Sequence, residues 1–185
     1  MGRTYTVTTT VYQYAELDDK AKGKARHWYR SCEDCYCWGD ESVASLKAFA
    51  DWFGVKIRDY SLGGSDNWNN HVKWELDRFD QWFELEDVRL WKYLNNNPHH
   101  LPKLDGSCPF TGYCMDETLL DPIREFMKRP TINECMTIEK LIGEGIDKFV
   151  SAYCADVDYS YSDEAVAENI ELNEYEFTKE GNRYL

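Results

Sequence analysis

The sequence predicts an α+β fold in a single domain, residues 1–185, in which an antiparallel sheet of three to five strands packs with four to six helices. Three observations lead to this prediction. Several segments repeat apolar residues at helical spacing, others alternate apolar and polar residues as half-buried strands do, and no change of composition marks a linker. A chain of 185 residues is also long enough to bury one sizeable core.

The amino-terminal third begins with a strand pattern and continues with two helical patterns. Residues 4–11 alternate threonine with larger side chains, which predicts a strand with one buried face. Residues 18–31 carry apolar side chains at helical spacing, and Asp18 or Asp19 is placed to cap the first turn. A second helical pattern occupies residues 43–53.

The middle of the chain predicts a hairpin and a third helix. Gly54 closes the second helix in the usual position for a C-cap glycine. Val55 and Ile57 open a short strand that stops at Gly63 and Gly64, and residues 65–70 form a polar turn. Residues 71–77 then alternate polar and apolar side chains, so the two segments predict an antiparallel hairpin. Residues 83–94 then follow a helical period that ends before Pro98.

Two further helices and a terminal hairpin complete the predicted elements. Asp121 and Pro122 suit the N-cap and the first position of a helix. Thr137 is placed to cap a longer helix with a regular apolar stripe. Residues 175–184 hold aromatic side chains on both sides of a Lys-Glu-Gly turn, which favours a small hairpin.

The sequence predicts a cytoplasmic protein with reduced thiols. Its start lacks a basic segment followed by an apolar one, so a secretory signal is not expected. No apolar run approaches the roughly 18 residues of a membrane span. The seven cysteines are scattered and odd in number, unlike a small secreted disulfide framework.

Charge is distributed unevenly along this acidic chain. There are 34 acids and 21 bases, a net charge of −13. Residues 1–30 hold six bases and three acids, whereas residues 155–178 hold eight acids and no lysine or arginine. An acidic surface such as residues 155–178 would form repels phosphates and attracts basic partners.

A group of cysteines is the first candidate site, because thiolate and imidazole are the ligands that zinc prefers. The candidate ligands are Cys32, Cys35, Cys37 and Cys108, with Cys114, His99 and His100 as alternatives. The spacing within the first three is permissive, but five residues separate Cys108 from Cys114, which weakens the match. The alternative interpretation is a set of partly buried thiols in an aromatic-rich loop.

Catalytic patterns are weak. Asp66, Glu75 and Asp77 lie near the predicted hairpin and could together hold a magnesium ion, but no acid-x-Lys partner accompanies them. No serine or cysteine stands in a strand-turn-helix elbow. We therefore expect a protein that is not an enzyme and that needs no cofactor, with a zinc- or magnesium-dependent module or enzyme as the alternative.

The acidic carboxy-terminal segment is the candidate partner-binding surface. If residues 163–172 are helical, three glutamates form a row spaced by about one helical turn. Such a row can take the place of phosphates in a nucleic-acid-binding groove, as in a DNA mimic. Interleaved tyrosines supply the anchors that an interface needs, while a merely solvated helix face is the alternative. The candidate residues are Asp156, Asp158, Asp163, Glu164, Glu168, Glu171, Tyr159 and Tyr161.

The basic residues of the first helix resemble a nucleic-acid patch. They are Lys20, Lys22, Lys24, Arg26 and Arg30. The acidic remainder would repel a duplex at long range, so we expect these bases to pair with acids of the same molecule or of a second copy. We therefore expect no direct nucleic-acid binding and no membrane binding, with a homodimer as one arrangement.

Several segments resemble a widespread group of small phage and prophage proteins whose function is mostly unassigned. The similar segments are residues 12–17 with 20–29, residues 109–114 with 121–123, and residues 162–165 with 173–178. The resemblance covers nearly the whole chain and carries over no catalytic residue.

This resemblance implies an accessory phage protein acting in the host cytoplasm. Acidic proteins of this kind often block host defence, as anti-CRISPR and anti-restriction proteins do. We therefore expect a non-enzymatic inhibitor that binds a basic, nucleic-acid-binding surface of a host defence component. An antitoxin-like regulator that neutralises a basic toxin would use the same acidic surface.

Overall fold

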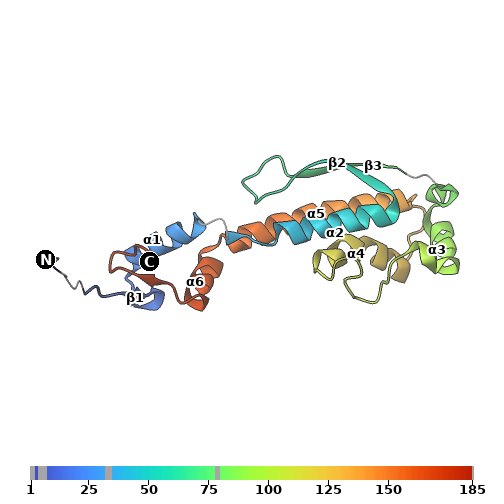
Figure 1. The fold of residues 1–185 in the computed structure, drawn as a ribbon. Coiled ribbons are helices and arrows are strands. Elements are labelled where there is room, and N and C mark those ends of the chain that lie inside the picture. Colours follow the sequence, from blue (N-terminus) through green and yellow to red (C-terminus); the bar gives the residue numbers. More distant parts are fainter. Residues whose placement is uncertain (1–2, 4–7, 32–34, 78–79, 185) are drawn as a thin grey trace. The chain divides into compact units, whose positions relative to one another are not determined.

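A computed structural model describes residues 3, 8–31, 35–77 and 80–184. The chain divides into two compact units, unit 1 formed by Met1–Cys37 with Asp158–Leu185, and unit 2 formed by Trp38–Val157. Figure 1 shows the elements of both. The single domain predicted for residues 1–185 stays a prediction, because two compact units can unfold either together or separately.

Unit 1 joins the two ends of the chain around one core. Its elements are β1 (Tyr12–Gln13), the 3-10 helix η1 (Tyr14–Glu16), α1 (Asp19–Arg30), α6 (Asp163–Leu172) and β4 (Glu176–Phe177). β1 and β4 pair antiparallel, with Tyr12 opposite Phe177. The core side chains are Tyr14, Leu17, Ala21, Ala25, Tyr29, Cys35, Val166, Ile170 and Phe177. The apolar stripes of α1 and α6 therefore bury one another, which neither helix can do by itself.

Unit 2 is mainly helical. Its elements are α2 (Gly39–Phe53), β2 (Val55–Ser61), β3 (His71–Leu76), η3 (Gln81–Glu84), α3 (Asp87–Asn96), η4 (Pro98–His100), α4 (Met115–Lys128) and α5 (Ile138–Ser160), the last of which runs on into unit 1. None of the helices described combines the length and hydrophobicity that a membrane crossing requires.

The core of unit 2 lies where α2, α4 and α5 meet. Figure 1 shows α5 running alongside α2. Phe49, Leu119 and Phe149, one from each helix, are fully buried. Gly145 permits this approach, because a Cβ atom there would lie 2.3 Å from the carbonyl oxygen of Leu119 and 3.5 Å from the Phe49 ring. A glycine in the middle of α5 thus brings two backbones together.

Several predicted elements are confirmed. Helix α1 begins at Asp19, and the Asp18 carboxylate accepts a hydrogen bond of 2.8 Å from the backbone N–H of Ala21. Gly54 ends α2 in the left-handed conformation, with φ of 65°. The Thr137 hydroxyl accepts from the backbone N–H of Lys140 in the first turn of α5. The predicted hairpin is the β2–β3 pair, and its first strand ends at Ser61, just before Gly63 and Gly64, where the strand was predicted to stop.

The predicted sheet of three to five strands is wrong. In the described residues the strands form two separate two-stranded ladders, β1–β4 in unit 1 and β2–β3 in unit 2. Residues 8–11 have no strand structure, and residues 4–7 lie outside the described part of the chain. The strands do not share a sheet because they belong to different units, and helix-on-helix packing buries the core in their place.

The predicted helix start at Asp121 and Pro122 is also wrong, because both residues lie inside α4. The buried side chains of α4 already begin at Met115 and continue through Leu119 to Phe126. Burial of this stripe outweighs the one backbone hydrogen bond that a proline removes. Similarly, α3 starts later than predicted, at Asp87, because the preceding aromatic residues form η3.

Candidate interaction surface

Helix α6 separates an apolar face from an acidic one. Its N-cap, Ser162, accepts a hydrogen bond of 3.2 Å from the backbone N–H of Ala165. Val166 and Ile170 are fully buried in the core of unit 1. The three glutamates of the predicted row, Glu164, Glu168 and Glu171, are all exposed. Residues 163–172 are thus helical as the interpretation required, and the row lies on the solvent side.

Asp163 is exposed but, unlike the glutamates of this row, it is paired with bases of α1. Its Oδ1 atom accepts a hydrogen bond of 2.5 Å from Arg30 and lies 3.2 Å from Nε of Arg26. The hydrogen bond from Arg30 lowers the pKa of Asp163. Two bases of α1 therefore pair with an acid of the same molecule, as expected, and tie α1 to α6.

The remaining acids and tyrosines lie near the end of α5. Tyr159 and Tyr161 are 57% and 40% exposed, so both rings are accessible on unit 1. Asp158 is exposed in the same unit. Asp156 is assigned to unit 2, is half-buried, and has a raised pKa because burial disfavours its charged form.

An acidic pocket adjoins the end of the glutamate row. It has a volume of about 270 Å³ and lies between residues 13–15 and the end of α6. Glu171 and Glu174 line it together with Tyr14 and Tyr175. Carboxylates beside aromatic rings match the two parts of a lysine or arginine side chain, its charged end and its apolar stem.

The candidate zinc ligands have different environments. Cys35 is buried in unit 1, with Sγ 3.5 Å from the carbonyl oxygen of Ser160, and Cys37 is exposed. Cys108 belongs to unit 2, and burial raises the pKa of its thiol. Cys32 lies outside the described residues. Within the described part of the chain, no three His, Cys, Asp or Glu side chains are grouped so that they could hold a metal ion.

The hairpin acids are not gathered into a site. Glu75 forms an ion pair with Arg58 across the β2–β3 ladder, and the hydrogen bond from Arg58 lowers the pKa of Glu75. Asp66 lies in the turn between the strands and Asp77 follows the end of β3. The register therefore places Asp66 and Asp77 at opposite ends of the hairpin.

Asp116 is a buried carboxylate that the sequence reasoning missed. It is fully buried, and its oxygens accept hydrogen bonds from the backbone N–H groups of Phe110, Thr111 and Gly112 and from the Thr111 hydroxyl. All of these donors lie in the loop just before α4. The carboxylate is fully engaged in holding this loop, so it is structural and leaves no open position for chemistry.

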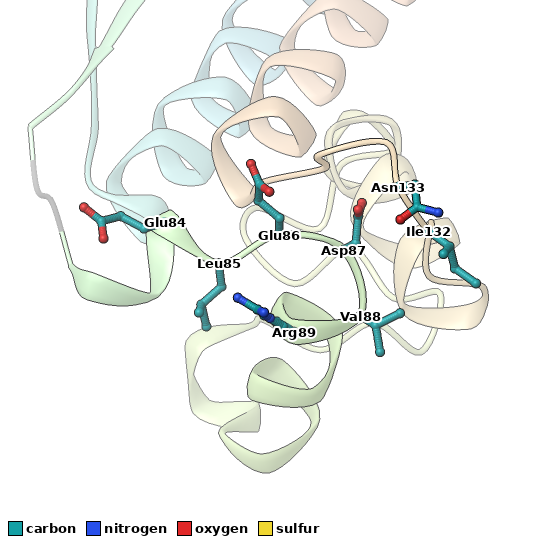
Figure 2. Close-up of a pocket in the computed structure, with 8 residues that line it drawn as sticks. All are labelled: Glu84, Leu85, Glu86, Asp87, Val88, Arg89, Ile132 and Asn133. Atoms are coloured by element: carbon teal, nitrogen blue, oxygen red, sulfur yellow. The ribbon is translucent and has the colours of Figure 1, made fainter.

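Asp87 has a similar role at the start of α3. It accepts from the Thr131 hydroxyl at 2.8 Å and from the backbone N–H of Met136 at 2.9 Å. Figure 2 shows its side chain directed toward the loop that carries Ile132 and Asn133, beside a pocket of about 400 Å³. The backbone hydrogen bond from Met136 lowers the pKa of Asp87. Its φ of 49° is unusual outside glycine, so no propensity rule would have predicted this contact.

Two histidines line an aromatic pocket of about 370 Å³ in unit 2. Nε2 of His100 lies 3.1 Å from the Tyr93 hydroxyl, and its ring centroid is 4.9 Å from that of Trp82. Burial lowers the pKa of His100. The His100 ring thus packs among aromatic side chains, with one of its nitrogens within hydrogen-bond distance of the Tyr93 hydroxyl.

Comparison with protein-family models, with curated proteins and with solved structures gives no significant match for this chain. The class of protein that the fold and surface define is therefore a helix-rich α+β protein with an acidic outer face on α6.

Proposed function

We propose that this chain is a non-enzymatic inhibitor that binds a basic, nucleic-acid-binding surface of another protein through the acidic face of α6. The observation that supports this most directly is the row Glu164, Glu168 and Glu171. All three side chains are exposed, and none has an ion-pair partner among the described residues. An acidic helix face without internal partners is available to a cationic one.

The neighbouring features supply what a charged row lacks. Exposed charges by themselves contribute mainly to the rate of encounter and to specificity. Tyr159 and Tyr161 offer apolar area for a stable contact. The pocket lined by Glu171 and Glu174 offers a place for one basic side chain of the partner. The resemblance to phage proteins extends the proposal to a host-defence component as the partner.

The test is affinity capture from lysate of defence-competent host cells, followed by direct binding to the purified partner. We expect a basic nucleic-acid-binding protein that duplex DNA displaces competitively. Reversal of the row in a Glu164→Lys, Glu168→Lys, Glu171→Lys variant should weaken binding by at least about tenfold, because close interfacial charge pairs couple by roughly 1.5 kcal/mol or more.

A matched control separates the surface from the total charge. Glu139, Glu144 and Asp147 are exposed acids on α5 in unit 2, and replacing them by lysine changes the net charge equally. This control should leave the affinity nearly unchanged. Equal loss in both variants, or a partner that binds DNA and this chain at the same time, would disprove the proposal.

A further inference from the structure

A cationic groove of about 610 Å³ lies in unit 1 between α1 and the turn that precedes the carboxy terminus. Lys20, Lys24 and His27 line it from α1, and Arg183 lines it from the turn. No carboxylate is among the described residues that line it, although the chain has 34 acids. The groove is thus a local exception to the acidity of the molecule.

Helix α1 divides its bases between two roles. Arg26 and Arg30 pair with Asp163, and Nζ of Lys22 lies 5.7 Å from the centroid of the Tyr14 ring. Lys20 and Lys24 have no ion-pair partner within the part of the chain that the structure describes. They are four residues apart and share a helix face, where like charges repel. A bound anion would remove that repulsion.

Gly23 is a second, independent observation. It lines the groove in the interior of α1, where glycine is less favourable than alanine by about 1 kcal/mol. A Cβ atom at this position would meet nothing within 4 Å, so packing does not require the glycine. Its effect is to leave the helix backbone open to the groove, as at sites where a ligand approaches closely.

The opposite wall packs closely against α1. Gly181 has φ of 79°, and a Cβ atom there would lie 2.2 Å from the carbonyl oxygen of Ala21, so the turn lies directly against α1. The Arg183 guanidinium lies 4.7 Å from the centroid of the Tyr175 ring and donates a hydrogen bond of 2.9 Å to the carbonyl of Glu176. These contacts orient the Arg183 side chain, and an oriented side chain loses less entropy when a ligand binds.

We propose that this groove binds a small ligand that carries two or three phosphate groups. Two lysines and an arginine are the side chains that recognise phosphate, and His27 adds a further donor. The net charge of −13 opposes long-range attraction of a polynucleotide, which favours a compact anion. The volume also suits a ligand of nucleotide size. None of the α6 glutamates lines this groove, so the two sites can be tested separately.

The test is calorimetric titration of the full chain with pyrophosphate and with ADP. We expect saturable binding of one ligand per chain. A Lys20→Gln, Lys24→Gln variant should weaken it by at least about tenfold, because two charge-assisted contacts are removed. The control Lys47→Gln, Lys56→Gln removes two exposed lysines of unit 2 and should keep the affinity within about twofold of the wild type.

A steric variant tests the groove without changing its charge. Gly23→Leu fills the open position with a better helix former, so circular dichroism should show a folded protein while binding is lost. Three results would overturn the proposal: no saturable binding of either phosphate ligand, equal weakening by both lysine pairs, or unchanged affinity in folded Gly23→Leu. Tighter binding of a single-stranded oligonucleotide than of ADP would also overturn it, in favour of a nucleic-acid surface.

Discussion

Two aspartates, Asp87 and Asp116, show how single carboxylates organise loops in unit 2. Each accepts hydrogen bonds from at least three backbone N–H groups of one loop and from a threonine hydroxyl. A carboxylate in this position satisfies donors that no helix or strand would otherwise pair. Both acids therefore contribute to the structure of their loops.

The Asp87 contact predicts a pH dependence of stability. Its pKa is lower in the folded chain, so the unfolded chain binds the proton more readily and the contact's stabilisation is lost as the pH falls. Asp87→Asn keeps a residue that tolerates positive φ and removes the charge. We expect this variant to be less stable than the wild type at neutral pH, with a difference that shrinks below about pH 4. Urea unfolding across a pH series measures it.

Asp66 provides the comparison for that measurement. It is exposed in the same unit, and its side chain has no hydrogen bond to a described residue. Asp66→Asn should match the wild type in unfolding midpoint throughout the series. A stability difference for Asp87→Asn that stays constant from neutral to acid pH would show that geometry, and not charge, holds the loop.

At the scale of elements, the close approach of α4 and α5 depends on one glycine. Gly145→Ala would place a methyl group 2.3 Å from the carbonyl oxygen of Leu119, so the helices must separate. We expect a loss of about 1 to 3 kcal/mol in the free energy of unfolding, even though alanine is the better helix former. Chemical denaturation provides the measurement.

The neighbouring residue is the matched control for this packing. Glu144 is exposed on the same turn of α5, and Glu144→Ala should change the stability by no more than about 0.5 kcal/mol. If Gly145→Ala were as stable as the wild type, the two helices would have to pack with a larger separation than the structure has.

At the scale of the whole molecule, unit 2 contains its own core. Its largest buried side chains come from α2, α3, α4 and α5. We expect residues 38–157, expressed as a separate polypeptide, to be helical by circular dichroism and to unfold cooperatively on heating, because helix-on-helix burial needs no residue of unit 1. A polypeptide without cooperative unfolding would show instead that residues 1–185 fold as one domain.

Local patterns predicted most of the elements in advance. The cap at Asp18, the C-cap at Gly54 and the hairpin of β2 and β3 all follow from residues within a few positions of one another. The helix start predicted at Pro122 was wrong. It was predicted because proline is common in the first turn of a helix, but Pro122 lies inside α4. The buried apolar side chains from Met115 to Phe126 favour a helix that begins earlier and includes Pro122.

The candidate sites divide in the same way. The sequence by itself determined the acidity, its concentration after residue 155 and the helical spacing of the glutamate row, because these are properties of neighbouring residues. Only the tertiary structure decided that Asp163 pairs with Arg26 and Arg30, that the strands form two separate ladders, and that Arg183 meets Lys20 and Lys24 around one groove. These contacts are between residues more than a hundred positions apart, or they depend on which surfaces bury each other. The local spacing of residues in the sequence predicts neither of these things.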